Sequence, residues 1–228
     1  MVSDRRPIFC LVTDRRRLCA GCGDHDARRC LIAQVREAVA AGIDLVQIRE
    51  REMEAAHLAD VVSQAVAAAR GSATRIVVND RLDVALACGA DGVHLRADSV
   101  PPARVRALVP PGFLVGRSVH AADEAAQVAP DVDYLIAGTV FPTASKPGAG
   151  RWLGDAGLAG VTHAVAVPVL AIGGVTIELL PRVAAAGAAG IAAIGLFLDE
   201  GASARCRSVP LHNIVTAARA PFDELRAR

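Results

Sequence analysis

The sequence predicts an α/β fold of the closed (β/α)8 type, the TIM barrel, in a single domain spanning residues 1–228. Three observations lead to this prediction. Short β-branched runs alternate with Ala-rich helical stretches along the chain. The predicted strands are apolar throughout, which is typical of a parallel sheet buried on both faces. The length of 228 residues is also close to the ~250 residues that such barrels need.

In the first half of the chain, four predicted strands alternate with helices. In order, we expect a strand at 8–13, a helix at 31–41, a strand at 45–48, a helix at 55–69, a strand at 76–78, a helix at 82–88 and a strand at 92–95. Gly42 and Gly89 end two of these helices, because glycine suits the left-handed turn after a helix. Pro101 and Pro102 begin the next helix, because proline is favoured in a first turn.

The second half continues the alternation. We expect a strand at 113–115, a helix around Glu124, strands at 134–137 and 167–172, a helix at 178–186 that ends before Gly187, and a strand at 190–193. The barrel core should therefore span about residues 8–200, with a Cys-rich loop at 18–30 after the first strand. A doubly wound open sheet is the alternative fold. It is disfavoured because no Gly-rich dinucleotide fingerprint follows the first strand.

Composition restricts the possible partners. Apolar residues make up 53% of the chain and aromatic residues 3%, so the core is built from Ala, Val, Leu and Ile. The net charge of +1 provides no overall field to attract nucleic acid or an anionic membrane. No segment resembles a membrane span or a signal peptide. We therefore expect a cytoplasmic protein with neither nucleic-acid nor membrane partners, whose six cysteines are thiols or ligands instead of disulfides.

Polar side chains follow most of the predicted strands. In a barrel, such residues converge on one mouth. They are Asp14, Gln47, Arg49, Arg51, Asn79, Asp80, His94, Ser118, His120, Thr143, Ser145, Lys146, Gly173, Gly174, Ile194 and Gly195. Arg49 and Arg51 alternate along a segment that we expect to be extended, so both should point the same way. With Lys146 they predict a site for phosphate or pyrophosphate; the alternative is a set of solvated rim residues.

Glycines follow the last two strands. Gly173-Gly174 comes after strand 167–172, and Ile194-Gly195 comes after strand 190–193. The loops at these positions commonly hold phosphate in such barrels, because backbone N–H groups must approach the ligand closely. A plain tight turn is the alternative interpretation.

Six segments together resemble a known family. They are Gln47-Ile48-Arg49-Glu50-Arg51, Val78-Asn79-Asp80-Arg81, Ala90-Asp91-Gly92-Val93-His94-Leu95, Gly116-Arg117-Ser118-Val119-His120, Phe141-Pro142-Thr143-Ala144-Ser145-Lys146 and Ala171-Ile172-Gly173-Gly174. In order and content these segments resemble the thiamine phosphate synthases and their sister family, the thiazole tautomerases. The resemblance covers roughly residues 8–200 and does not separate the two.

The resemblance to the synthases implies a transferase of thiamine biosynthesis. Such an enzyme joins hydroxymethylpyrimidine diphosphate to thiazole phosphate and releases pyrophosphate. The implied substrate-binding residues are Gln47, Arg49, Arg51, Asn79, Ser118, Thr143, Ser145 and Lys146 toward the diphosphate and its neighbourhood, and Gly174, Ile194 and Gly195 in the thiazole-phosphate cradle. Arg49 and Lys146 would act catalytically by neutralising the charge of the leaving group. The implied partners are small phosphate and diphosphate substrates; whether the chain forms a homo-oligomer is left open.

The implied cofactor is Mg²⁺, which would bridge diphosphate oxygens. Asp80 matches one metal ligand of the synthases. The second metal carboxylate of the family aligns with Ser99, within Arg96-Ala97-Asp98-Ser99, so Asp98 is the candidate replacement. The family also usually has Lys at the position of Arg51, and arginine keeps the charge with a different geometry.

The tautomerase alternative uses different residues. Ile48-Arg49-Glu50-Arg51 and Arg117-Ser118-Val119-His120 are closer to that sister family, which needs no metal. His120 would be its acid/base, because histidine titrates near neutral pH. Asp80 and Gln47 favour the synthase, which is therefore the preferred hypothesis.

A cysteine cluster lies outside the family pattern. Cys19, Cys22, His25 and Cys30 have a spacing that resembles a metal clip for Zn²⁺ or Fe. Free surface thiols or a local disulfide are the alternatives. This cluster supports a third hypothesis, a metal- or redox-sensing binding protein on the same barrel. Cys10 and Cys88 are expected to be core residues.

Overall fold

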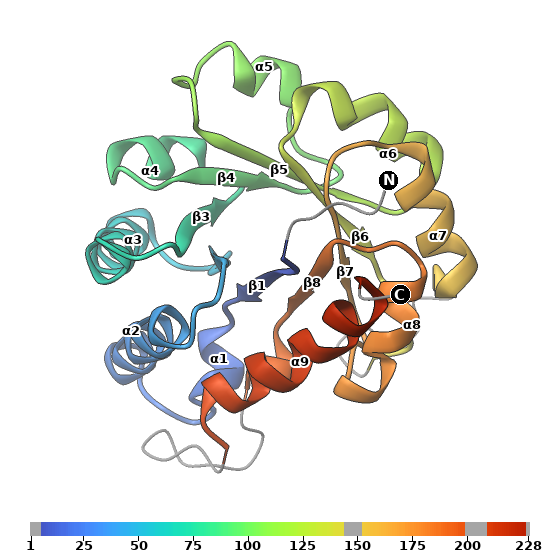
Figure 1. Ribbon diagram of the computed structural model, residues 1–228. Helices are drawn as coiled ribbons and strands as arrows, with labels where there is room; N and C mark the ends of the chain where they lie inside the picture. The colour runs from blue at the N-terminus through green and yellow to red at the C-terminus, as the bar shows by residue number, and fades with distance from the viewer. Residues whose placement is uncertain (1–5, 144–151, 199–208, 227–228) are drawn as a thin grey trace. The chain divides into compact units, whose positions relative to one another are not determined.

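A computed structural model describes residues 6–143, 152–198 and 209–226, in which eight parallel strands form a closed barrel in chain order (Figure 1). The strands are β1 (Ile8–Val12), β2 (Leu45–Ile48), β3 (Arg75–Asn79), β4 (Gly92–Leu95), β5 (Leu114–Val119), β6 (Tyr134–Gly138), β7 (Val169–Ile172) and β8 (Gly190–Ala193). The barrel closes between β1 and β8, where the backbone N–H of Ile8 donates to the carbonyl of Ala189, the residue before β8, at 3.0 Å. The predicted closed (β/α)8 barrel is confirmed.

Helices follow the strands. They are α1 (Arg15–Leu18), α2 (Asp24–Ala40), α3 (Ala55–Ala69), α4 (Leu82–Ala87), α5 (Pro102–Arg106), α6 (Ala122–Val128), α7 (Gly154–Ala164), α8 (Leu180–Ala185) and α9 (Leu211–Arg226), with 3₁₀ turns η1 (Ala129–Asp131), η2 (Ile177–Leu179) and η3 (Gly195–Phe197). Gly42 and Gly89, predicted to end helices, have φ of +72° and +66°. This left-handed conformation is the one in which glycine carries no steric penalty.

The chain divides into two compact units, each described by itself. The β2–β4 unit comprises the described residues among 10–94 and 194–216. In it, Val12 pairs with Gln47, and Gln47 pairs with Val77. Helix α2 packs against α3, and α3 against β3 (Figure 1). The register places the segment after β1 beside the segment after β2.

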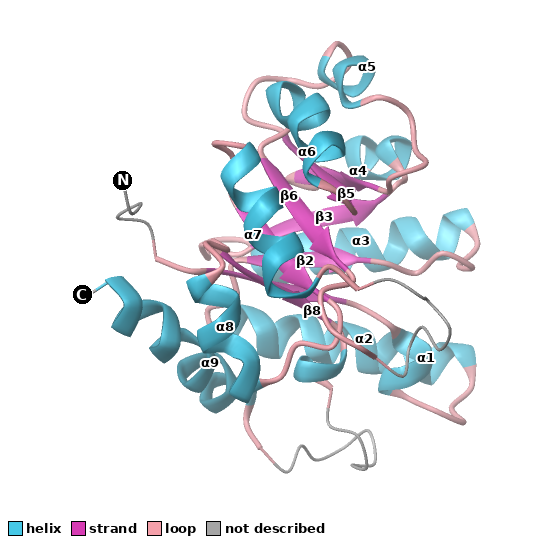
Figure 2. Cartoon of the chain, turned by 90° about the vertical axis from the view of Figure 1, so that its right-hand side faces the viewer, coloured by secondary structure: helices cyan, strands magenta, loops and turns pink. Residues whose placement is uncertain are grey.

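The β5–β8 unit comprises the described residues among 6–9, 95–193 and 217–226. Helices α6 and α7 pack against each other, with α6 also against β5 and α7 against β6 (Figure 2). The end of α9 lies against the start of β1. There Phe222 meets Phe9 edge to face at 6.1 Å, and the Arg219 guanidinium lies 4.8 Å from the centre of the Phe9 ring.

The structure extends several predicted elements. Helix α2 begins at Asp24 instead of residue 31, so half of the expected Cys-rich loop is helical. Asp24 and Asp26 lie in its first turn, where carboxylates stabilise the positive end of the helix dipole. Strand β5 continues to Val119, because the parallel register with β6 runs from Gly116 opposite Tyr134 to Val119 opposite Ala137. Helices α1, α7 and α9 are additional to the predicted set.

The length and apolar character of the described helices were compared with those of membrane-spanning helices. Within residues 6–143, 152–198 and 209–226, none is both long enough and apolar enough to cross a bilayer.

Candidate functional site

Two predicted amides meet at the ends of adjacent strands in the β2–β4 unit. Gln47 is the third residue of β2 and is buried, and Asn79 is the last residue of β3. The Gln47 side-chain N–H₂ donates to Asn79 Oδ1 at 3.0 Å. Because the Asn79 oxygen is the acceptor in this bond, its amide nitrogen is the end that can donate to a ligand. The pair therefore fixes which end of the Asn79 side chain is available as a donor.

Asp80, which directly follows this pair, has an unusual backbone conformation. Its φ is +63°, and among the described residues Asp80 is the one residue other than glycine that has a positive φ. Its backbone N–H donates to the carbonyl of His94 at 2.9 Å, which holds the loop against the end of β4. Aspartate tolerates this region better than most residues, but at a cost in backbone energy. Such local strain is often found at functional sites and is consistent with a placed carboxylate.

A buried ion pair supports the segment that carries Arg49. Glu50 is 6% exposed and Arg15 is 8% exposed. Arg15 Nη1 donates to Glu50 Oε2 at 2.9 Å, and the Thr13 hydroxyl donates to Glu50 Oε1 at 2.8 Å. The same Thr13 oxygen accepts the backbone N–H of Arg49 at 2.9 Å. The end of β1 and the end of β2 are thus joined around one buried carboxylate.

Burial also shifts the ionisation of this carboxylate. Desolvation raises the pKa of Glu50 above its usual value, against the opposing effect of the hydrogen bonds from Arg15 and Thr13. The ion pair therefore offsets only part of the cost of burying the charge. Sequence reasoning did not assign a role to Thr13, Arg15 or Glu50. A glutamate between two arginines, directly after an apolar strand, was the available signal.

Arg49 and Arg51 differ in their surroundings. Arg49 is half-buried at the end of β2, whereas Arg51 is exposed. The backbone turns between them and the next helix, because the N–H of Met53 donates to the carbonyl of Glu50 at 3.0 Å. The expectation of an extended segment is therefore not met at Arg51, which lies in this turn. The reason is that the chain must reverse within a few residues to enter α3.

The glycine after β8 lies beside a cation. Gly195 begins η3 and is exposed, with Ile194 half-buried before it. A side-chain carbon at Gly195 would lie 3.6 Å from Arg17 Nη2 of α1. The Gln34 amide donates to the Phe197 carbonyl at 3.1 Å and holds the far end of this turn. The expected phosphate cradle at Ile194 and Gly195 therefore has a guanidinium next to it.

In the β5–β8 unit, Gly174 allows two loops to touch. Its φ is +66°, and a side-chain carbon there would lie 2.4 Å from the Pro142 carbonyl oxygen. The neighbouring Gly173 carbonyl accepts the backbone N–H of Phe141 at 3.0 Å. The segment that leads to Thr143 is therefore packed directly on the loop after β7. Thr143 is half-buried; Ser145 and Lys146, predicted to bind substrate, lie outside the described residues.

Ser118 and His120 lie at the end of β5. Ser118 belongs to the strand itself, opposite Ile136, and is half-buried. His120 Nδ1 hydrogen-bonds to the carbonyl of Gly138, and its backbone N–H donates to Glu124 Oε2 at 2.7 Å. A carbonyl oxygen can only accept, so Nδ1 carries the proton and Nε2 is the basic nitrogen of the neutral ring. His120 can therefore accept or return a proton through Nε2.

The segment 96–99, which was expected to supply a second metal carboxylate, forms hydrogen bonds and an ion pair between its own residues. Asp98 Oδ2 accepts from the Arg96 guanidinium at 2.9 Å, and Ser99 Oγ accepts the backbone N–H of Arg96 at 3.0 Å. Arg117, which is 7% exposed, donates to the carbonyls of Ala97 and Val100 at 2.6 and 3.0 Å. The sequence motif that contains Arg117 indicated no role for it; in the structure its guanidinium holds this loop in place. Asp98 forms a surface ion pair in the structure, with its side chain 74% exposed.

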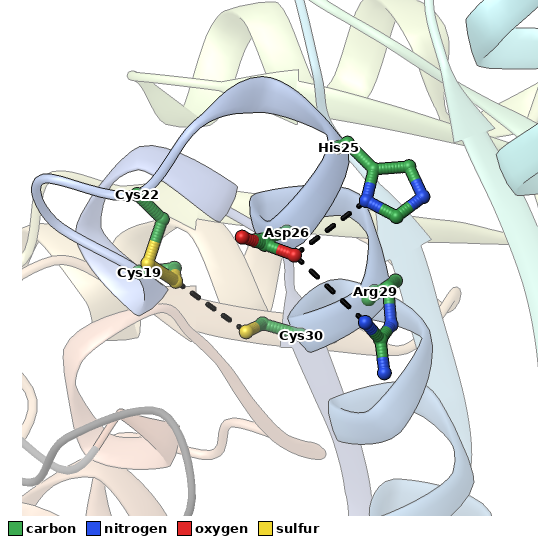
Figure 3. The surroundings of a disulfide bond; sticks show 6 residues. All are labelled: Cys19, Cys22, His25, Asp26, Arg29 and Cys30. Carbon is green, nitrogen blue, oxygen red and sulfur yellow. Dashed lines mark hydrogen bonds and ion pairs between the residues drawn. A yellow bond between two sulfur atoms is a disulfide. The ribbon is translucent and has the colours of Figure 1, made fainter.

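The cysteine cluster contains a disulfide. Cys19 and Cys22 are bonded to each other, and Cys30 Sγ lies 3.4 Å from Cys19 Sγ (Figure 3). His25 is turned toward Asp26, 3.5 Å away, and its side chain is 77% exposed. The expectation that the cysteines are thiols or ligands is wrong for Cys19 and Cys22, because the turn between them brings their Cα atoms to 5.6 Å, a distance suited to a disulfide. Across the described residues, no three His, Cys, Asp or Glu side chains are grouped to hold a metal.

The other described cysteines are free thiols. Cys10 is fully buried in β1, as expected, and desolvation raises its pKa to about 12. Cys88 is half-buried at the end of α4, with its Sγ 3.4 Å from the carbonyl of Ala59.

Comparison with known proteins gives consistent matches. The chain matches the family model described as thiamine monophosphate synthase over residues 17–197. It is 41% identical over 190 residues to the thiamine-phosphate synthase of Methanoculleus marisnigri, covering 81% of this chain and 88% of that protein. It is 45% identical over 164 residues to the thiamine-phosphate synthase of Solidesulfovibrio magneticus, covering 72% and 74%.

Solved structures agree at the level of the whole chain. The thiamine phosphate pyrophosphorylase from Pyrococcus furiosus superposes with a TM-score of 0.77 at 28% identity, covering 96% of both chains. A 3-hexulose-6-phosphate synthase superposes with a TM-score of 0.67 at 19% identity, covering 94% of this chain and 99% of that one, a likeness of fold alone.

Proposed function

We propose that this chain, which belongs to the thiamine monophosphate synthase family, is a thiamine-phosphate synthase. It couples hydroxymethylpyrimidine diphosphate to thiazole phosphate and releases pyrophosphate. The observation that carries this proposal is the Gln47–Asn79 pair with Asp80 directly after it. Two oriented amides followed by a placed carboxylate suit a diphosphate that is bound with a divalent cation.

In this reaction the protein must stabilise a departing diphosphate. Asn79 donates to its oxygens, and the guanidinium of Arg49 supplies a fixed positive charge from a segment anchored by Thr13 and Glu50. Lys146 supplies a second positive charge in this proposal, and Thr143 and Ser145 supply hydroxyl groups. Leaving-group charge is then neutralised as the bond to the pyrimidine breaks and the thiazole nitrogen attacks.

The donor set fits Mg²⁺ through a single protein carboxylate. Mg²⁺ is often held by one or two carboxylates together with substrate phosphates. Asp80 is the candidate ligand, because it is half-buried and held at the end of β3. Asp98 is bound by Arg96 and Ser99 accepts a backbone N–H, so neither is presented as a second ligand. When bound, Mg²⁺ supplies charge neutralisation on the diphosphate.

The second phosphate site is proposed on the two glycine loops. Gly195 lies next to the Arg17 guanidinium, and Gly174 packs on the loop that precedes Thr143. We assign the thiazole phosphate to Gly174, Ile194 and Gly195. We also propose that the substrates are small phosphates and diphosphates. We propose the cytoplasm as the location of the enzyme.

The tautomerase remains a second candidate because of one observation. His120 holds a proton on Nδ1 and presents a basic Nε2, which suits metal-free proton transfer. The synthase reaction does not require His120 to transfer a proton.

One pair of assays decides between the two reactions. The purified protein is given pyrimidine diphosphate, thiazole phosphate and Mg²⁺, and separately the carboxythiazole tautomer with EDTA. We expect thiamine phosphate in the first assay, lost with EDTA and in Asp80→Asn. His120→Ala is the matched variant and should retain coupling. Isomerisation in EDTA that is lost in His120→Ala, with no coupling at any Mg²⁺ concentration, would establish the tautomerase instead.

A further inference from the structure

Three sulfur atoms lie together where α1 is followed by α2, and none of them belongs to the residues assigned to substrate. Cys19 directly follows the last residue of α1, Cys22 lies at the end of the next turn, and Cys30 lies on α2 (Figure 3). Cys30 Sγ is 3.4 Å from Cys19 Sγ, the sulfur already bonded to Cys22. Cys19 is therefore the sulfur that both of the others can reach.

The three sulfurs differ in exposure. Cys19 is 5% exposed, Cys30 is intermediate and Cys22 is exposed. A thiol from solution can therefore attack the disulfide at Cys22, whereas Cys19 is shielded and faces Cys30. Arg15 and Arg16 line the same surface pocket as Cys19 and Cys22, together with Asp24.

A purely structural role explains this arrangement poorly. The disulfide joins residues only three apart, so it restrains the unfolded chain little compared with a bond that closes a long loop. A structural bond also gives no reason for a third thiol in contact with one of its sulfurs. Attack through a mixed disulfide is the reaction that such a thiol supports.

We propose that Cys19, Cys22 and Cys30 form a thiol–disulfide exchange site, with Cys22 as the sulfur that meets an external small thiol and Cys19 as the shared sulfur. An external thiolate attacks Cys22 Sγ, the Cys19–Cys22 bond breaks, and the electron pair leaves on Cys19, which takes a proton from water. A second external thiolate then displaces Cys22 from the mixed disulfide. Two thiols are oxidised to one disulfide, and the protein disulfide becomes two thiols.

The same geometry allows an internal exchange. The Cys30 thiolate can attack Cys19 Sγ, forming Cys19–Cys30 and releasing Cys22 as a thiolate, with no net change in oxidation state. Exchange at Cys19 frees the turn from the end of α1 in either case.

The site is connected to the segment that carries Arg49. Cys19 is bound to the last turn of α1, where its N–H donates to the Arg15 carbonyl at 3.0 Å. Arg15 holds the buried Glu50, the residue next to Arg49. Releasing the disulfide should therefore loosen α1 and weaken anion binding at Arg49. This consequence rests on the proposed function, whereas the exchange chemistry does not.

Cross-link mapping tests the exchange site. Cys22→Ser and Cys19→Ser are each incubated with oxidised glutathione, digested and mapped by mass spectrometry, after circular dichroism confirms folding. We expect most of Cys22→Ser to form Cys19–Cys30, and little Cys22–Cys30 in Cys19→Ser. No Cys19–Cys30 bond, or equal cross-linking in both variants, would overturn the proposal. When the unmutated protein is partly reduced with glutathione, the mixed disulfide with glutathione should form on Cys22. A mixed disulfide on Cys19 would contradict the proposal.

Pyrophosphate binding tests the connection to Arg49. Oxidised protein should bind pyrophosphate about fivefold more tightly than reduced protein, the lower end of typical couplings between sites. The Cys22→Ser/Cys30→Ser double variant leaves Cys19 without a partner in the cluster and should not respond to redox state. Equal affinity in both states of the unmutated protein would refute the connection. Absence of pyrophosphate binding in either state, with cross-linking as expected, would count against the proposed synthase only.

Discussion

Replacing Arg15 by methionine should expose the cost of the buried Glu50 charge. The Arg15 and Glu50 side chains are 9% and 3% exposed and lie 2.9 Å apart. Methionine preserves most of the aliphatic stem of Arg15 but removes its charge and donors. Removing one partner of a buried ion pair costs about 3–5 kcal/mol, because the other charge stays buried without its partner. For a chain of this size, we expect the unfolding temperature to fall by at least about 6 °C.

The adjacent arginine provides a matched control. Arg16 pairs with Glu52, and their side chains are 66% and 60% exposed. An exposed ion pair contributes about 0–1 kcal/mol. Arg16→Met should therefore lower the unfolding temperature by at most about 4 °C. Both variants are compared by thermal unfolding followed by circular dichroism.

The pH dependence of Arg15→Met supplies a second test. Burial raises the pKa of Glu50, and in the variant the opposing effect of Arg15 is absent. The native state then binds a proton at pH values where the unfolded state is still ionised. The free energy of unfolding of Arg15→Met, measured relative to Arg16→Met, must therefore increase as pH falls through the raised pKa of Glu50. Equal losses in Arg15→Met and Arg16→Met, or a loss that does not shrink at lower pH, would refute the buried-charge argument.

Three further predictions concern other parts of the chain. Arg49→Ala should weaken pyrophosphate binding about tenfold or more, by loss of a charge-assisted hydrogen bond, measured by calorimetry; unchanged affinity would remove Arg49 from the site. Gly174→Ala should destabilise the protein by about 2 kcal/mol or more, because the new side-chain carbon would sit on a left-handed φ of +66° and 2.4 Å from the Pro142 carbonyl oxygen. Gly160→Ala in α7 is the control and should stabilise the protein by up to about 1 kcal/mol, because there is open space around Gly160. Similar unfolding temperatures for the two variants would contradict this prediction. Cys10, whose pKa burial raises to about 12, should resist iodoacetamide in the folded protein and react in denaturant, as shown by peptide mapping; labelling as fast as Cys88 would show that β1 opens.

The fold and the strand ends follow from local sequence. Apolar runs of the length of a strand, separated by Ala-rich helices that end at glycines such as Gly42 and Gly89, can be satisfied only by a parallel sheet covered by helices. The family motifs likewise assigned Gln47, Asn79 and Asp80 to one site, and the parallel register brings these three together in one unit. Periodicity carries this information because each strand and helix is specified by residues adjacent in the chain.

What supports the site was decided by tertiary structure. Arg15 and Glu50 are 35 positions apart, and only the pairing of β1 with β2 places the guanidinium on the carboxylate. The turn from Cys19 to Cys22 and the pitch of α2 likewise determine that Cys30 faces Cys19, where the spacing alone also allowed a metal clip. A residue's type shows which interactions it can make, but burial and a distant partner determine which one it does make, and these are fixed only when the strands pair.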